Sequence, residues 1–187
     1  MVIGMMFFHN TSIAAVRTWT GAVSTNWSNP ANWLEGSIPG PTDDVYFTAA
    51  DPLQGCLLDI STSIHHLSID PIYGYLITFP AGKTLSISGD LYIGNPWIIW
   101  DNNANIIFNG STDQHIEIDN YVDWPFYDLT INKPSGNVIL DSDIIVSNIF
   151  NLISGSIDCN GFSGPCPPPC TPPQTGGIYH IANDFAL

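Results

Sequence analysis

The sequence predicts an all-β protein whose short strands wind into a single-stranded, right-handed parallel β-helix, or β-solenoid. The chain has 25 isoleucines but only two glutamates, two lysines and one arginine, so residues that usually cover helix surfaces are scarce. Apolar and polar residues alternate in many short runs, which is typical of half-buried strands. Residues 67–70 resemble residues 129–132, and residues 88–93 resemble residues 147–152, at offsets of 62 and 59 positions. Such self-similarity favours stacked units over the alternative, an antiparallel β-sandwich.

The sequence divides the chain into five segments. Residues 1–16 are apolar and form a first strand or the remnant of a secretion signal, although the basic start of such a signal is missing. Residues 17–55 are rich in tryptophan and turn residues and are expected to cap the solenoid. Residues 56–161 form the solenoid itself, because each alternating run offers too few inward side chains to build a core alone. Residues 162–177 form a linker rich in proline and cysteine, and residues 178–187 form a last strand.

Charge excludes two classes of partner. The net charge is −14, and the chain holds only three lysines and arginines. Binding to nucleic acid or to an anionic membrane surface needs a cluster of basic side chains, and three scattered ones do not form it. No apolar run approaches the roughly 18 residues that a membrane span requires, so we expect no membrane insertion.

Several motifs carry a family resemblance. Residues 19–21 (WTG), 27–33 (WSNPANW) and 38–45 (IPGPTDDV) resemble an opening segment that reads approximately W-x-G, W-S-x-P-x-N-W, x-G-x-x-P, D-D-V. This segment precedes β-strand repeats in secreted, adhesin-like cell-surface proteins of bacteria, many of them Bacteroidetes-type. Residues 126–133 and 143–155 are similar to those repeats. The resemblance spans about residues 17–161 and implies a secreted surface protein, although this chain is much shorter than the relatives.

The six tryptophans fall into two groups with different expected roles. The first group is expected to cover the open end of the solenoid, and a platform that stacks on sugar rings is the alternative: Trp19, Trp27 and Trp33. The second group flanks loops and holds the candidates for contact with a partner: Trp97, Trp100 and Trp124.

Cysteines, acidic residues and histidines are candidates for cross-links or metal sites. The four cysteines fit disulfides in an oxidising compartment, with the pairing left open: Cys56, Cys159, Cys166 and Cys170. Three aspartates in turns offer the oxygen ligands that calcium prefers: Asp101, Asp141 and Asp143. Strand alternation predicts that His65 and His66 point to opposite faces and therefore do not share a metal ion.

These observations together predict a non-enzymatic, extracellular structural protein. A solenoid has two open ends that must be capped or filled by another copy. We expect a terminal strand of each subunit to add to the sheet of its neighbour, giving a head-to-tail homopolymer. The residues expected to carry this assembly lie in the two terminal strands: Phe7, Phe8, Ile178, Tyr179, Ile181 and Phe185. The alternatives are an adhesin that binds polysaccharide and, more remotely, a β-helix enzyme that cleaves it.

Overall fold

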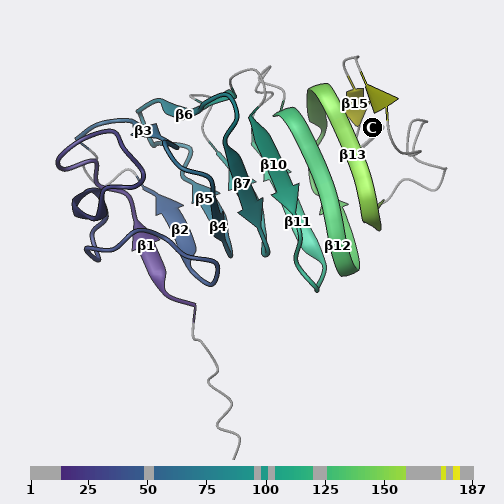
Figure 1. Ribbon diagram of the computed structural model, residues 1–187, viewed down its shortest axis with the longest axis horizontal. Helices are drawn as coiled ribbons and strands as arrows, with labels where there is room; N and C mark the ends of the chain where they lie inside the picture. Colours follow the sequence, from purple (N-terminus) through teal and green to yellow (C-terminus); the bar gives the residue numbers. More distant parts are fainter. Residues whose placement is uncertain are drawn as a thin grey trace, which may run out of the picture.

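The protein is a parallel β-solenoid of about four turns, as seen in a computed structural model. The structure describes residues 14–48, 53–94, 98–100, 104–119 and 126–158, together with the backbone of two short strands near the C-terminus. The strands stand side by side along one axis, from the first coil to the last (Figure 1). The structure confirms the predicted β-solenoid and not the antiparallel sandwich. No helix within these ranges is long and apolar enough to cross a membrane.

Each coil contributes strands to up to three faces. The first face holds β1 (Val16–Thr18), β2 (Asp44–Phe47), β5 (Leu67–Ile69), β8 (Leu91–Ile93) and β11 (Gln114–Ile118). The second face holds β4 (Thr62–Ile64), β7 (Thr84–Ile87) and β10 (Asn105–Phe108). The third face holds β3 (Cys56–Leu57), β6 (Ile77–Phe79) and β9 (Ile98–Trp100).

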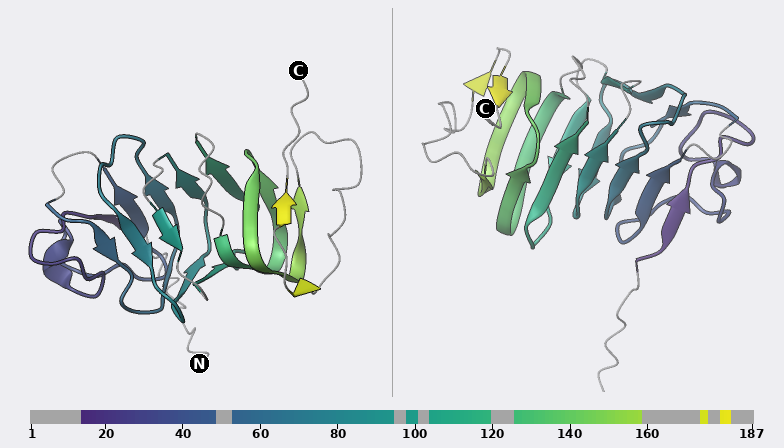
Figure 2. Two further views of the ribbon diagram at one scale, coloured as in Figure 1. Left: turned by 90° about the horizontal axis from the view of Figure 1, so that it is seen from above. Right: turned by 180° about the vertical axis from the view of Figure 1, so that it is seen from behind.

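Two long strands join the first and second faces in the last coils. The strand β12 (Phe126–Leu140) pairs with β10 through its first half and with β11 near its end, so it runs around a corner of the solenoid. The strand β13 (Ile144–Asp158) follows β12 in parallel over both faces. Two short strands, β14 (Gln174–Thr175) and β15 (Tyr179–Ile181), then pair with β13 in the antiparallel direction. The views from above and behind show this end of the stack (Figure 2).

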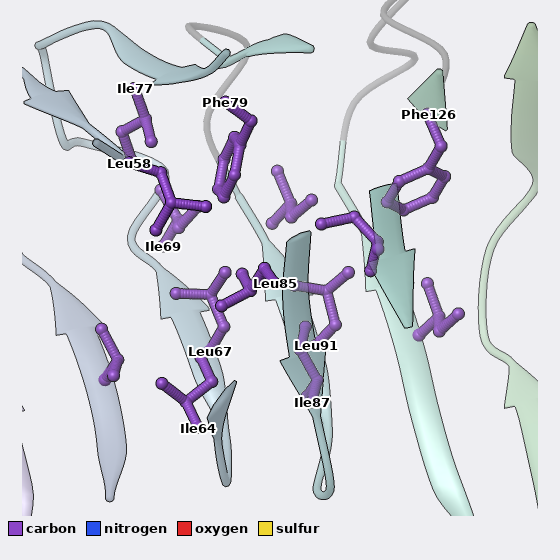
Figure 3. Packing of buried hydrophobic residues seen from close by; sticks show 14 of the residues in the cluster. Leu58, Ile64, Leu67, Ile69, Ile77, Phe79, Leu85, Ile87, Leu91 and Phe126 are labelled. Atoms are coloured by element: carbon purple, nitrogen blue, oxygen red, sulfur yellow. The ribbon is translucent and has the colours of Figure 1, made fainter. Parts of the chain in front are cut away.

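The core is a set of rows that run from coil to coil. On the first face, Val45, Leu67, Leu91, Ile116 and Leu140 follow one another in register, and each is at most 1% exposed. Successive members lie 22–25 residues apart, which is the length of one coil. Inward side chains from different faces meet in one interior (Figure 3). Polar residues alternate with them and point outward, as the period of two requires.

The internal repeat in the sequence has a different origin from the coil. Leu67 lies in β5 on the first face, whereas Leu129 lies in the part of β12 that belongs to the second face. The offsets of 62 and 59 residues therefore correspond to between two and three coils and connect strands of different faces. The predicted capping segment also contains β2 and most of β1, so the sheet begins before residue 56.

A substitution in one inner row tests this packing. Leu67→Ala removes a buried side chain between Val45 and Leu91, and we expect it to lower the free energy of unfolding by about 2–5 kcal/mol. The matched control is Ser68→Ala on the same strand, which points outward and should change stability by no more than about 0.5 kcal/mol. Guanidinium unfolding followed by circular dichroism measures both, and equal losses would contradict the inward row.

Candidate functional site

The N-terminal end of the solenoid is covered by an aromatic cluster. Trp19, Trp27 and Trp33 are at most 2% exposed and pack on Phe47 of the first coil. The rings of Trp27 and Trp33 meet edge to face, with centroids 4.8 Å apart and an interplanar angle of 73°. Their ring faces are buried, so they do not form an exposed platform for a sugar. The structure thus places all three in the position expected of a cap.

The same segment satisfies backbone groups at the N-terminal sheet edges. On β1, the N–H of Thr18 donates to Glu35 Oε2 at 2.9 Å, and its carbonyl accepts from the N–H of Leu34 at 2.9 Å. On β3, Leu57 exchanges backbone hydrogen bonds with Thr25 and Trp27 at 2.7 and 2.9 Å. Edge groups that are already hydrogen-bonded do not template pairing with another chain. The cap therefore closes the first and third faces at these positions.

The C-terminal end is covered by added strands. Residues 144–146 of β13 pair in the antiparallel direction with β15, and Ile149 and Phe150 pair with β14. Farther along β13, Ser156 and Ile157 pair with β12 on one side, and no described strand pairs with their other side. Ile153 between these regions is 60% exposed. The last coil is thus an edge that accepts additional strands.

Several predicted contact residues fall outside the described residues or are placed by backbone alone. The residues outside are Phe7, Phe8, Trp97, Asp101, Trp124, Cys159, Cys166, Cys170, Ile178 and Phe185. The structure gives only the backbone of Trp100 in β9 and of Tyr179 and Ile181 in β15. Their roles in assembly or partner contact stay predictions.

Cys56 is a free thiol buried in the core, so the structure does not support a disulfide at this position. Burial raises the pKa of the thiol, and the nearby Asp59 carboxylate raises it further. A protonated, buried thiol behaves as a small apolar side chain and reacts slowly.

Calcium binding at the predicted aspartates also stays a prediction. Asp141 Oδ2 lies 2.7 Å from His115 Nδ1, and Asp143 lies two residues farther in the turn between β12 and β13. Within the described ranges, these aspartates do not form a group of three metal-ligating side chains.

One group of three candidate metal ligands does occur in the described part of the chain: Asp44, His65 and His66. One ligand atom from each lies within 4.8 Å of the others, and the two imidazole centroids are 3.9 Å apart. The prediction that the two histidines point apart is therefore wrong. They lie in the corner between β4 and β5, where the alternation of an extended strand does not hold.

Coil geometry brings this group together. The pairing of Val45 with Leu67 places Asp44 beside His66, 22 positions later. The row continues one coil at a time with Asp90 and His115. The backbone N–H of Asp90 donates to His66 Nδ1 at 2.6 Å, and the N–H of His115 donates to Asp90 Oδ1 at 2.8 Å. The spacing of one coil between aspartates and histidines was the sequence signal that could have revealed this row.

A buried polar network occupies the same edge of the solenoid in later coils. Gln114 is fully buried, and its side-chain N–H groups donate to the carbonyls of Ile87 and Gly89. Its Oε1 accepts from Lys133 Nζ at 2.5 Å, and Nζ also donates to the carbonyl of Thr112 at 2.8 Å. Desolvation lowers the pKa of Lys133. These bonds fix the corner by satisfying carbonyls that would otherwise be unpaired.

Two tryptophans of the cap give a matched test of its hydrogen bonding. Trp33 Nε1 donates to the carbonyl of Trp27 at 2.9 Å, whereas Trp27 Nε1 is buried with no hydrogen-bond partner among the described residues. We expect Trp33→Phe to cost about 1–3 kcal/mol because it leaves a buried carbonyl unpaired. Trp27→Phe removes an unpaired donor and should cost less. Thermal and chemical unfolding measure both, and the reverse order would contradict this account.

Comparison with known proteins finds no matching family model, no matching curated protein and no matching solved structure.

Proposed function

We propose that the protein is an extracellular structural protein whose subunits assemble by terminal-strand addition. The C-terminal strand of one copy adds to the last coil of its neighbour. The observation that supports this proposal is the antiparallel pairing of β15 with residues 144–146 of β13. The edge of the last coil accepts this strand within one chain, and a neighbouring copy offers the same strand with the same hydrogen bonds.

The unequal ends of the solenoid support addition at the last coil. At the first coil, backbone groups of Thr18 and Leu57 are already bonded to the capping segment. At the last coil, β13 receives its outer strands from a segment that follows it by many residues in the sequence. Strands supplied by a distant segment are the elements most readily exchanged between copies.

The intervening segment is long enough for exchange. Twenty residues separate Asp158 from Tyr179, and many of them are prolines. A polyproline-type chain of this length would span at most on the order of 60 Å at about 3.1 Å per residue, so the length of the segment does not prevent exchange. If each copy gives its strand to the next, the exchange does not close, and a head-to-tail fibre results.

The surface charge disfavours polyanionic partners. A net charge of −14 leaves few basic groups for polyanionic partners. The extracellular assignment rests on the resemblance of the tryptophan-rich opening segment to those of secreted surface proteins. The proposal assigns the protein no catalytic step, and calcium and polysaccharide are not needed for assembly.

Deletion of residues 178–187 tests the proposal. It removes β15, and we expect assembly to be lost while the far-ultraviolet circular dichroism and the unfolding midpoint change little. The control is a truncation after Ile181, which keeps β15 and should still assemble. Light scattering during gel filtration and negative-stain electron microscopy measure the size and shape of the particles.

Three results would count against strand addition. Fibres formed by the chain without residues 178–187 would show that β15 is not the connecting element. Stronger assembly of that truncated chain would show that β15 is a lid over the edge of β13. A full-length chain that stays monomeric and binds a polysaccharide panel would instead favour the adhesin alternative.

A further inference from the structure

We propose that Asp44, His65 and His66 bind a divalent transition-metal ion with the preferences of zinc. This corner site is independent of the proposed assembly, because it lies on the side of the early coils and not at the last coil. It is the one group of three candidate metal ligands among the described residues.

The three ligand atoms are near enough to converge on one ion after small movements of the side chains. One ligand atom of each side chain lies within 4.8 Å of the other two. A tetrahedral zinc ion with bonds of about 2.0–2.2 Å holds its ligand atoms about 3.3–3.6 Å apart. The side chains of Asp44, His65 and His66 are 19%, 38% and 32% exposed, so they have room to close around an ion that enters from solvent. Water completes the coordination.

Hydrogen bonds in the corner define where the ion fits. His65 Nδ1 and Asp44 Oδ1 lie 2.7 Å apart and share a hydrogen. The ion takes the place of this hydrogen, and the imidazole of His65 then carries its proton on Nε2. His66 Nδ1 accepts the N–H of Asp90 at 2.6 Å, so coordination through this atom replaces one hydrogen bond with a bond to the metal.

The backbone leaves space for the ring of His66. A Cβ atom added to Gly89 would lie 2.6 Å from both Cε1 and Nδ1 of His66. Only glycine at this position lets the ring lie against the chain of the next coil. The imidazole is therefore held at the corner by packing against the next coil, and a side chain held in place by packing favours metal binding.

The ligand chemistry selects the class of ion. Two imidazoles with one carboxylate suit zinc, copper and nickel, whereas calcium takes six to eight oxygen ligands. The surroundings are negatively charged, since Asp90 Oδ2 lies 3.6 Å from His66 Nδ1. Arg17, which pairs with Asp43 at 2.9 Å, balances only one of the nearby carboxylates. A cation therefore relieves repulsion at this corner.

Zinc titration by calorimetry tests the site on the full chain. Any free thiol among Cys159, Cys166 and Cys170 is first blocked with iodoacetamide, because thiolates also bind zinc, whereas buried Cys56 resists the reagent. We expect one zinc ion to bind, a tenfold or greater loss of affinity in His65→Ala and in Asp44→Asn, and no displacement of zinc by excess calcium.

The matched control is His115→Ala. His115 also pairs with an aspartate at 2.7 Å, but its pair belongs to no described group of three ligands. We expect this variant to bind zinc as the unchanged protein does. The proposal is overturned if the unchanged chain binds no zinc, or if His115→Ala weakens binding as much as His65→Ala. Circular dichroism of each variant separates loss of the site from loss of the fold, and a misfolded His65→Ala is replaced by His65→Gln.

Discussion

The structure depends on the parallel pairing of each strand with the strand one coil later. Most strands of the early coils have two to four residues, and each buries about two side chains, so a single coil has no core of its own. Stacking joins these side chains into continuous rows and hydrogen-bonds the backbone of each strand to its neighbours. The same register controls the outer surface. Residues about 22–25 positions apart stand side by side on the first face, whatever their chemistry.

This constraint explains why the capped sheet edges lie at the ends of the solenoid and why polar side chains converge at its corners. The pairing cannot continue beyond the first and last coils, so the backbone groups at those edges need other hydrogen-bond partners. It covers the first coil with buried tryptophans and backbone hydrogen bonds, and the last coil with strands from its C-terminal segment. At the corners, the chain leaves the extended conformation and adjacent side chains can converge, as His65 and His66 do. The proposed assembly therefore uses the edge of the last coil, whereas the proposed metal site uses a corner of the early coils.

The sequence predicted the fold class because alternation and the scarcity of helix-forming residues are local properties. The expectation that Trp19, Trp27 and Trp33 cover the open end followed from the fold class, since the end of a solenoid must be capped, and the structure buries all three against Phe47. The sequence did not give the coil length, because strands on all faces obey one pattern and Leu67 matched Leu129 across faces. Without the coil length, Asp44 and His66 appeared unrelated, and strand alternation was applied at a corner where it fails. The burial of Lys133 was equally hidden, since its partner Gln114 lies in the preceding coil.

The register between coils is measured most directly by nuclear Overhauser contacts between backbone protons. We expect contacts from Leu67 to Leu91 and from Leu91 to Ile116, with the pattern of parallel strands. Contacts between strands that follow one another in the sequence, such as β5 with β6, and close pairs of Hα protons are instead the pattern of antiparallel hairpins. Observation of that second pattern across the middle of the chain would contradict the solenoid and every inference drawn from its coils.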